Sequence, residues 1–122
     1  MGHQKIKELA IKKFVDRFQG SYKKMGINDV DYRVFDASKN LISYAEVVVI
    51  NKTINTAYPL EVKANNVVRV CNKRLNPVVL WACVDGLIYG KPHEIIGQVS
   101  WKDNELILTY PKQKTLKYLK YY

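Results

Sequence analysis

Apolar residues recur every three or four positions in two parts of the chain, which is the spacing of one face of a helix. Over residues 5–19 this spacing predicts an amphipathic helix that ends near Gly20. Its apolar positions are Ile6, Leu9, Ala10, Phe14, Val15 and Phe18. A second, shorter helix is predicted after Asn66, with apolar positions at Val67, Val68, Cys71 and Leu75.

Alternating and β-branched segments between these helices predict strands. Residues 32–35 form a short strand, and residues 42–50 form a central strand whose β-branched end suggests burial on both faces. Residues 58–64 resume an alternating pattern. The polar, turn-like residues 51–56 separate these two strands, so we expect the two to pair as a hairpin.

The last third of the chain is predicted to be rich in hairpins. One hairpin spans residues 78–89 and turns at Asp85-Gly86, and another spans residues 101–110 and turns at Asp103-Asn104. Residues 93–96 are expected to form a short helical segment. Residues 111–122 fit an amphipathic helix that docks Leu116 and Leu119 on the core.

The alternation of helices and strands predicts an α/β fold. A chain of 122 residues has the size of one domain, and 48% hydrophobic residues are enough to form its core. We expect a single domain over residues 1–122, with a core at about residues 5–90. Residues 98–122 would then be a hairpin followed by a basic, aromatic C-terminal extension.

The charge of the chain points to a polyanionic partner. Twenty Lys and Arg against eleven Asp and Glu give a formal net charge of +9, above what solubility of a small domain needs. DNA is therefore the first candidate, with other nucleic acids possible and a merely well-solvated surface as the alternative. No apolar run is long enough to span a bilayer, and the start lacks an apolar signal segment. The expectation is no membrane and an intracellular location, cytoplasmic or associated with the nucleoid.

The cysteines and histidines add no recognisable metal or disulfide motif. Cys71 and Cys83 are two lone cysteines in apolar surroundings, and we expect both to be buried, reduced thiols. The two histidines, His3 and His93, are too far apart in the sequence for a paired histidine motif.

Candidate chemistry lies on the predicted strand 58–64. Glu61 and Lys63 are two residues apart, so both side chains leave the same face, and Glu46 on the preceding strand reaches that face if the register permits. Carboxylates bind hard divalent cations such as Mg²⁺, and a nearby lysine can orient an attacking water. The alternative is an ordinary ion pair on an exposed sheet face.

The order of these elements resembles the core of the PD-(D/E)XK nuclease superfamily, over roughly residues 5–89. Leu60-Glu61-Val62-Lys63 is similar to the acid-x-Lys element of the third core strand, and residues 45–49 are similar to the acidic strand before it. The resemblance implies a restriction-endonuclease-like domain, with a mixed central β-sheet flanked by helices. It also implies Mg²⁺ or Mn²⁺ held by Glu46, Glu61 and the Val62 carbonyl, with Lys63 positioning the water.

Some positions depart from the family pattern. No Pro-Asp pair precedes the strand 58–64, so Glu46 would replace the usual aspartate, unless Asp36 or Asp31 supplies it. Glu8, on the first helix, sits where some members place a further acid.

Basic residues that could hold the substrate cluster in two segments. No acid occurs between Lys63 and Val84, so the second helix would present cations to a phosphate backbone, unless it is an ordinary solvated face. Residues 111–122 also lack an acid and interleave lysines with tyrosines, which suits backbone neutralisation and base stacking. The candidate nucleic-acid-binding residues are Arg69, Lys73, Arg74, Lys112, Lys114, Lys117, Lys120 and Tyr118.

The sequence therefore predicts a Mg²⁺-dependent DNA endonuclease that hydrolyses phosphodiester bonds, with branched, viral or repair DNA as candidate substrates. The alternatives are a non-catalytic nucleic-acid-binding module and a nuclease-fold scaffold subunit. One chain has one active site, so cutting two strands suggests a homodimer, for which the apolar hairpin at residues 99–110 is the candidate interface. The alternative is that this hairpin only covers a sheet edge.

Overall fold

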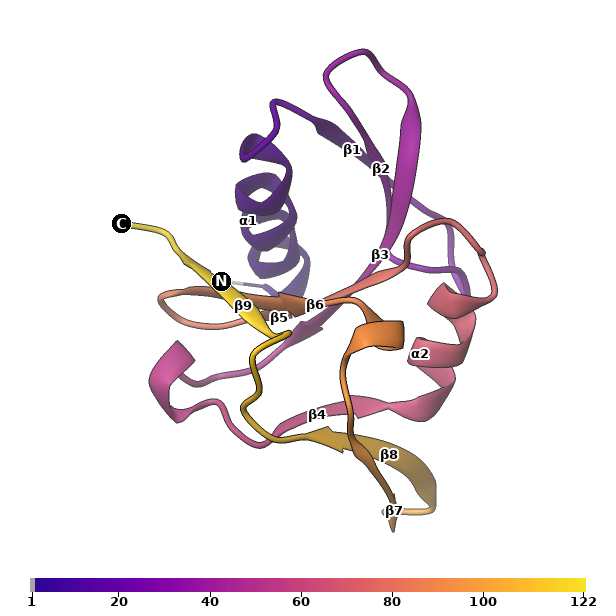
Figure 1. The fold of residues 1–122 in the computed structure, drawn as a ribbon, viewed down its shortest axis with the longest axis vertical. Helices are drawn as coiled ribbons and strands as arrows, with labels where there is room; N and C mark the ends of the chain where they lie inside the picture. Colours follow the sequence, from indigo (N-terminus) through magenta and orange to yellow (C-terminus); the bar gives the residue numbers. More distant parts are fainter. Residues whose placement is uncertain (1) are drawn as a thin grey trace.

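The computed structural model describes residues 2–122 and is a mixed α/β structure built on two β-sheets (Figure 1). Its helical segments are α1 (His3–Asp16), η1 (Ile54–Thr56), α2 (Ala64–Cys71) and η2 (Pro92–Glu94). Its strands are β1 (Ser21–Lys24), β2 (Tyr32–Phe35), β3 (Leu41–Val49), β4 (Leu60–Lys63), β5 (Val78–Ala82), β6 (Gly86–Gly90), β7 (Gln98–Lys102), β8 (Glu105–Tyr110) and β9 (Lys117–Lys120).

The elements form three layers. A six-stranded sheet, in the order β1-β2-β3-β5-β6-β9, lies in the middle. Its strands are antiparallel except for β3 and β5, which are parallel, so the sheet is mixed. Helix α1 covers one face of this sheet, and α2 covers the other together with a three-stranded sheet in the order β4-β8-β7 (Figure 1).

Helix α1 packs through most of the apolar positions that the sequence predicts, but Leu9 is 46% exposed and Ile11, which was not among them, is fully buried. Ala10, Ile11, Phe14 and Val15 are buried against strand residues that include Ala45. The helix is followed by a sharp turn at Gly20, where any Cβ would clash with the Phe35 carbonyl oxygen. Glycine is therefore required where the chain leaves α1 and enters β1.

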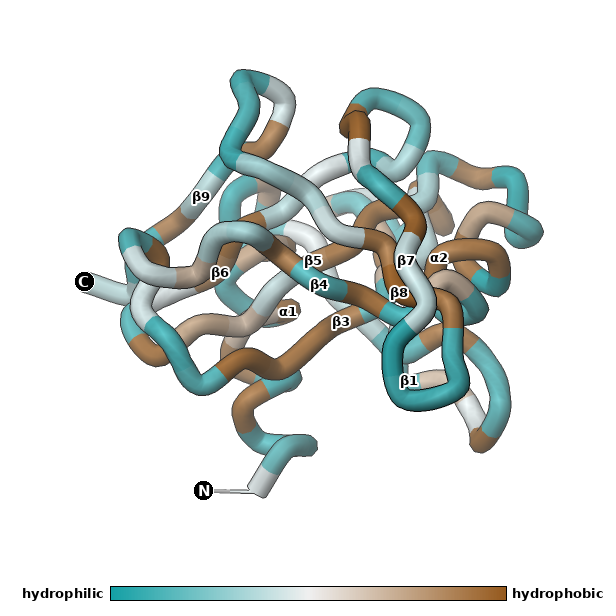
Figure 2. The backbone as a smooth tube through the Cα atoms, turned by 90° about the horizontal axis from the view of Figure 1, so that it is seen from below, coloured by the Kyte–Doolittle hydropathy of each residue, from teal (hydrophilic) through white to brown (hydrophobic). Residues whose placement is uncertain are grey.

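The second core lies between the six-stranded sheet and the layer of α2 and β4. Trp81 on β5 is fully buried there and packs edge-on against Tyr110 of β8. Its indole N–H donates a hydrogen bond to the carbonyl of Glu61 at 2.9 Å, which ties the two sheets together. Figure 2 shows hydrophobic residues along β3, β5 and β8, where these layers meet.

Several local predictions are confirmed. The first helix, the strands at β2 and β3, and the hairpins β5–β6 and β7–β8 form where the pattern places them. The segment 93–96, expected to be helical, overlaps the short 3₁₀ helix η2 only at His93 and Glu94, and Ile95 is extended. Both cysteines are free thiols, of which Cys83 is buried and Cys71 half-buried. In the described residues, neither helix has the length and apolar character needed to cross a bilayer.

Two predictions of long-range structure are wrong. Strand β4 does not pair with β3 as a hairpin, because residues 50–59 carry the chain into the other layer, where β4 pairs with β8. The C-terminal segment is not a helix, because residues 117–120 alternate in a strand that pairs with β6. Leu116 is nevertheless buried and Leu119 packs on the core, so their predicted docking is confirmed.

Candidate functional site

Glu61 and Lys63 lie on the solvent-exposed face of the three-stranded sheet. Strand β4 alternates, so that Leu60 and Val62 point into the core while Glu61 and Lys63 point outward. Lys102 Nζ lies 3.4 Å from Glu61 Oε1, and Lys63 Nζ lies 3.6 Å from Glu105 Oε1. These two residues therefore form exposed ion pairs with the β7–β8 hairpin, which is the alternative that the sequence left open.

Glu46 does not reach the face that holds Glu61 and Lys63, so the predicted grouping of these three side chains is wrong. The reason is the pairing of β4 with β8, which puts the backbone of β4 in the other sheet. Glu46 points instead from β3 towards α2, where Arg69 lies beside it. The Val62 carbonyl lies in the three-stranded sheet with Glu61 and is likewise separated from Glu46 by this arrangement.

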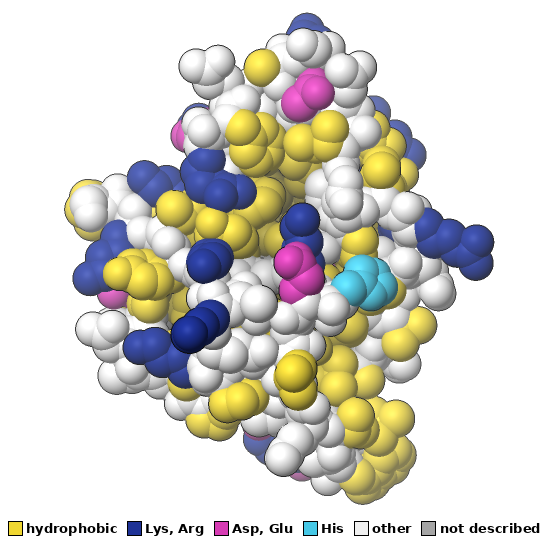
Figure 3. All heavy atoms as spheres, in the orientation of Figure 1, with side chains coloured by type: hydrophobic (Ala, Val, Ile, Leu, Met, Phe, Trp, Pro, Cys, Tyr) yellow, Lys and Arg dark blue, Asp and Glu magenta, His cyan; other side chains and the backbone are white. Residues whose placement is uncertain are grey.

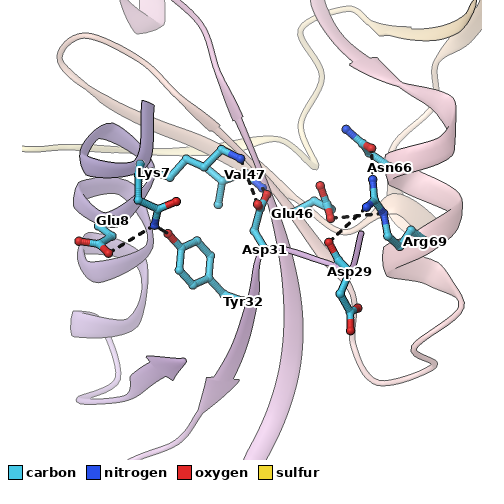
Figure 4. Close-up of polar contacts among 10 residues, drawn as sticks. Lys7, Glu8, Asp29, Asp31, Tyr32, Glu46, Val47, Asn66 and Arg69 are labelled. Atoms are coloured by element: carbon cyan, nitrogen blue, oxygen red, sulfur yellow. Dashed lines mark hydrogen bonds and ion pairs between the residues drawn. The ribbon is translucent and has the colours of Figure 1, made fainter. Parts of the chain in front are cut away.

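The acid that does meet Glu46 is Asp31. Tyr32 on β2 pairs with Ala45 on β3, so Asp31 and Glu46 are the next neighbours along this antiparallel pair. Asp31 Oδ2 accepts a hydrogen bond from the Val47 backbone N–H at 2.8 Å, which holds its carboxylate beside β3 (Figure 4). Glu46, Asp36 and Asp31 were the candidates for the second metal-binding acid. Of these three, the fold brings Asp31 and Glu46 together.

Asp36 occupies a different part of the molecule. It lies just past the other end of β2, where its carboxylate accepts hydrogen bonds from the backbone N–H groups of Ser38 and Asn40, both at 2.9 Å. The hydrogen bond from Asn40 is the main cause that lowers the pKa of Asp36 below its ordinary value. Asp36 thus stabilises the β2–β3 turn.

Helix α1 adds a cation and a hydrogen-bonded chain to the Asp31 side of the site. Lys7 Nζ lies 3.0 Å from Asp31 Oδ1. One turn away, the Gln4 side-chain amide donates to the Tyr32 hydroxyl at 2.8 Å and to Glu8 Oε1 at 3.3 Å. The carboxylate of Glu8 is thus held by Gln4, and Glu8 is not among the residues that line the cavity at Asp31 and Glu46.

Helix α2 adds a second cation on the Glu46 side. Arg69 Nε lies 3.9 Å from Glu46 Oε1, and the same guanidinium donates to the Asp29 carbonyl at 3.2 Å and to the Asn66 side chain (Figure 4). Lys73 pairs with the carboxylate of Asp29 at 2.8 Å. Arg69 and Lys73 therefore contact acids in this structure, and their role in binding a phosphate backbone stays a prediction. Arg74 is exposed and forms no ion pair among residues 2–122.

Glu46 is the most strongly perturbed acid of the site. Only 5% of its surface is exposed, and its Oε1 atom has no hydrogen-bond partner. Burial first, and the negative charge of Asp31 second, raise the pKa of Glu46 to about 8, although Arg69 and Lys7 oppose the shift. At neutral pH the carboxyl group of Glu46 is therefore protonated, unless a bound metal cation takes the place of the proton.

A cavity of about 620 Å³ opens onto these groups. Its lining includes Asp31, Glu46, Lys7 and Arg69, together with residues of the β1–β2 loop. Residues 2–122 contain no cluster of three or more His, Cys, Asp or Glu side chains placed to hold a metal. Glu46 on β3 and Asp31 just before β2 fit Mg²⁺, which usually takes one or two protein carboxylates and fills its other positions with water and phosphate oxygens.

Two features of this site were not predicted from the sequence. They are the participation of Lys7 and the structural role of Arg69. Helical spacing places Lys7 next to Gln4 and Glu8 on α1, but only the packing of α1 on β2 brings it to Asp31.

Comparisons with protein-family models, with curated proteins and with solved structures gave no match for this chain. The candidate site is therefore defined by the geometry of the Asp31–Glu46 pair.

Proposed function

We propose that this protein is a metal-dependent DNA nuclease whose divalent cation, Mg²⁺ or Mn²⁺, is held between Asp31 and Glu46. The observation that carries the proposal is the buried Glu46 carboxyl group, which has an oxygen without a hydrogen-bond partner and lies beside a second carboxylate at an open cavity. Ionising a buried carboxyl group is expensive, so Glu46 loses its proton at neutral pH only if a further positive charge compensates. A hard divalent cation supplies that charge.

The neighbouring cations have roles that follow from their positions. When bound, the cation would stabilise negative charge on a phosphate and lower the pKa of its water. Lys7, 3.0 Å from Asp31, would orient that water or hold a non-bridging phosphate oxygen. The resemblance implied the positioning of the water for Lys63. Arg69 holds the β1–β2 loop through the Asp29 carbonyl and presents its guanidinium to the same cavity, where it fits a phosphate group.

The arrangement of elements supports the resemblance to the PD-(D/E)XK nucleases if the third strand of the nuclease core is aligned with β3 instead of β4. Helix α1 is followed by three antiparallel strands, β1 to β3. After η1 and β4, which belongs to the other sheet, come α2 and then β5, which is parallel to β3. In this alignment Asp31 precedes the second strand, and Glu46 lies on the third, where the resemblance expects the metal-binding acid. Val48 stands two residues after Glu46, so the lysine must come from elsewhere, and Lys7 is the lysine that contacts the acid pair.

A non-catalytic nucleic-acid-binding module is the second candidate. It is favoured by the ion pairs of Lys7 with Asp31 and of Arg69 with Glu46, which partly neutralise the acids without a metal. The exposed lysines of residues 112–120 would then supply the binding surface. A scaffold subunit with a nuclease-like fold would share these features and require a protein partner.

Cleavage of supercoiled plasmid DNA with Mg²⁺, Mn²⁺ or EDTA distinguishes these proposals. We expect metal-dependent nicking by the wild-type protein and at least a hundredfold slower nicking by Glu46→Gln and Asp31→Asn, since each removes a metal ligand. Glu61→Gln and Asp36→Asn are the matched controls and should cleave like the wild type, with circular dichroism confirming that each variant is folded. Wild-type protein that binds DNA but never cuts it would favour the non-catalytic module, and an active Glu46→Gln would refute the proposed site.

A further inference from the structure

A second hollow of the described structure lies away from the Asp31–Glu46 pair. It has a volume of about 700 Å³ and is bounded by the C-terminal half of α1, the β2–β3 hairpin, the start of β5, the end of β6 and the segment before β9. Lys7 and Arg17 are ten residues apart on or just beyond α1, so the two sites are separated by about 15 Å along the helix axis. The proposed metal site therefore does not account for this hollow.

The wall of the hollow is apolar and aromatic. Phe14 packs edge-on against both Phe18 and Tyr89, with ring centroids 6.0 and 5.2 Å apart. The Arg17 guanidinium lies 4.5 Å from the centroid of Phe14 and 4.6 Å from that of Tyr89, and it donates to the Tyr89 hydroxyl at 2.8 Å. Ile42 continues the apolar wall. A guanidinium is a flat cation on which an aromatic group of a ligand can stack.

The rim of the hollow is strongly cationic. Arg17, Lys91, Lys114 and Lys117 are all exposed, and none forms an ion pair with a residue in the range 2–122. Glu94 is the one acid in the lining. In Figure 3 hydrophobic side chains lie between α1 and the β2–β3 hairpin, with Lys and Arg side chains at their margin. Such a site suits a ligand with a flat aromatic body and an anionic group.

We infer that this hollow binds one unpaired nucleotide of a DNA strand, with its base against Arg17 and the apolar wall and its phosphate among Lys91, Lys114 and Lys117. A base inside a duplex is stacked and cannot enter a hollow, so the ligand is single-stranded or locally unpaired DNA. The inference rests on the proposed function for the identity of the polymer, and it adds the class of substrate. Lys114 also lines a neighbouring cavity with Lys112, Tyr118 and Lys120, which offers a path for the adjoining nucleotides.

Binding measured in EDTA tests this inference independently of cleavage. Thymidine 5′-monophosphate, titrated into ¹⁵N-labelled protein, should shift the backbone amides of Gly90, Lys91 and Thr115. By fluorescence anisotropy, a short oligothymidylate should bind more tightly than a duplex of the same length. Amide shifts confined to other parts of the chain, or tighter binding of the duplex, would overturn the inference.

Variants locate the site. Thr115→Trp fills the mouth of the hollow from an exposed position and should weaken oligothymidylate binding about tenfold, whereas Ser100→Trp on the outer face of β7 should not. Lys114→Gln with Lys117→Gln should weaken binding more than the charge-matched pair Lys5→Gln with Lys52→Gln. Equal losses in the matched variants would overturn the inference. Binding is measured in EDTA and nicking in Mg²⁺, so the two results are independent. Nucleotide binding without nicking would refute only the proposed nuclease activity. Nicking without nucleotide binding would refute only the proposed nucleotide site.

Discussion

Asp31 accepts a hydrogen bond from the backbone N–H of Val47, the residue that follows Glu46, at 2.8 Å. This contact fixes one carboxylate to the strand that carries the other, so the two acids stay together without a metal. Repulsion between them is limited by Lys7 on one side and Arg69 on the other, and by the proton that Glu46 retains. In the proposed function, the pair exchanges that proton for a divalent cation.

Replacing Glu46 with Gln should stabilise the metal-free protein at alkaline pH. The pKa of Glu46 is raised from 4.5 to about 8, so folding favours the protonated acid, and this contribution is lost as the pH rises towards 8. Urea unfolding should show similar stabilities for wild type and Glu46→Gln near pH 5. At pH 8.5 the variant should be more stable, by on the order of 3 kcal/mol. A difference between the two proteins that does not change with pH would contradict the assigned burial of this acid.

Divalent cation binding should release a proton from Glu46. Below about pH 8 the cation must displace that proton, so affinity for Mn²⁺ should rise as the pH increases from 6 to 8. Isothermal titration calorimetry in buffers of different ionisation enthalpy measures the number of protons released. Asp31→Asn should bind the cation more weakly, and a wild-type affinity that is constant over this range would argue against Glu46 as a ligand.

Much of this fold could be predicted from the sequence because its elements are coded locally. The spacing of Phe14 and its neighbours fixes α1, and Asp85-Gly86 fixes a hairpin. Strand β1 escaped prediction because its residues, Ser21–Lys24, are mostly polar and exposed. The pairing of β4 with β8 was not predicted because it joins segments more than forty residues apart. An alternating pattern predicts a strand but does not indicate which other strand it pairs with.

The same limit applies to the site. Glu46 stands out as a lone acid in an apolar strand, and Asp31, like Asp36, was an alternative to Glu46 for the second metal-binding acid beside Glu61. Missing β1 moved the expected third strand from β3 to β4, which drew attention to Glu61 and Lys63. Lys7 could not be predicted at all, because its role depends on how α1 packs across β2.

The two tryptophans should differ sharply in their contribution to stability. Trp81→Phe removes a fully buried ring edge and leaves the Glu61 carbonyl without its hydrogen-bond donor, so the free energy of unfolding should fall by about 2–4 kcal/mol. Trp101→Phe, at a position that is 68% exposed, should change it by less than about 0.5 kcal/mol. Urea denaturation of both variants compares them directly. Similar losses would mean that Trp81 does not link the two sheets.

The β7–β8 hairpin remains the predicted interface of a homodimer. Val99, Trp101 and Leu106 are exposed apolar residues, and the pairing of Trp101 with Leu106 places them on one face of the hairpin. Light scattering at micromolar concentration should give twice the chain mass of 14.2 kDa, and Trp101→Glu should return the protein to a monomer. A wild-type mass near 14.2 kDa would mean that this hairpin only extends the sheet.

Paramagnetic broadening by Mn²⁺ tests most directly the proposal that Asp31 and Glu46 together hold the divalent cation. In ¹⁵N-labelled wild-type protein at pH 8, substoichiometric Mn²⁺ should broaden the amide signals of Asp31, Glu46 and Val47 first. Those of Glu61 and Lys63, on the outer face of the other sheet, should stay sharp. Glu46→Gln should abolish this broadening while Glu61→Gln leaves it unchanged. Broadening centred on Glu61 and Lys63, or identical in wild type and Glu46→Gln, would contradict the proposed site.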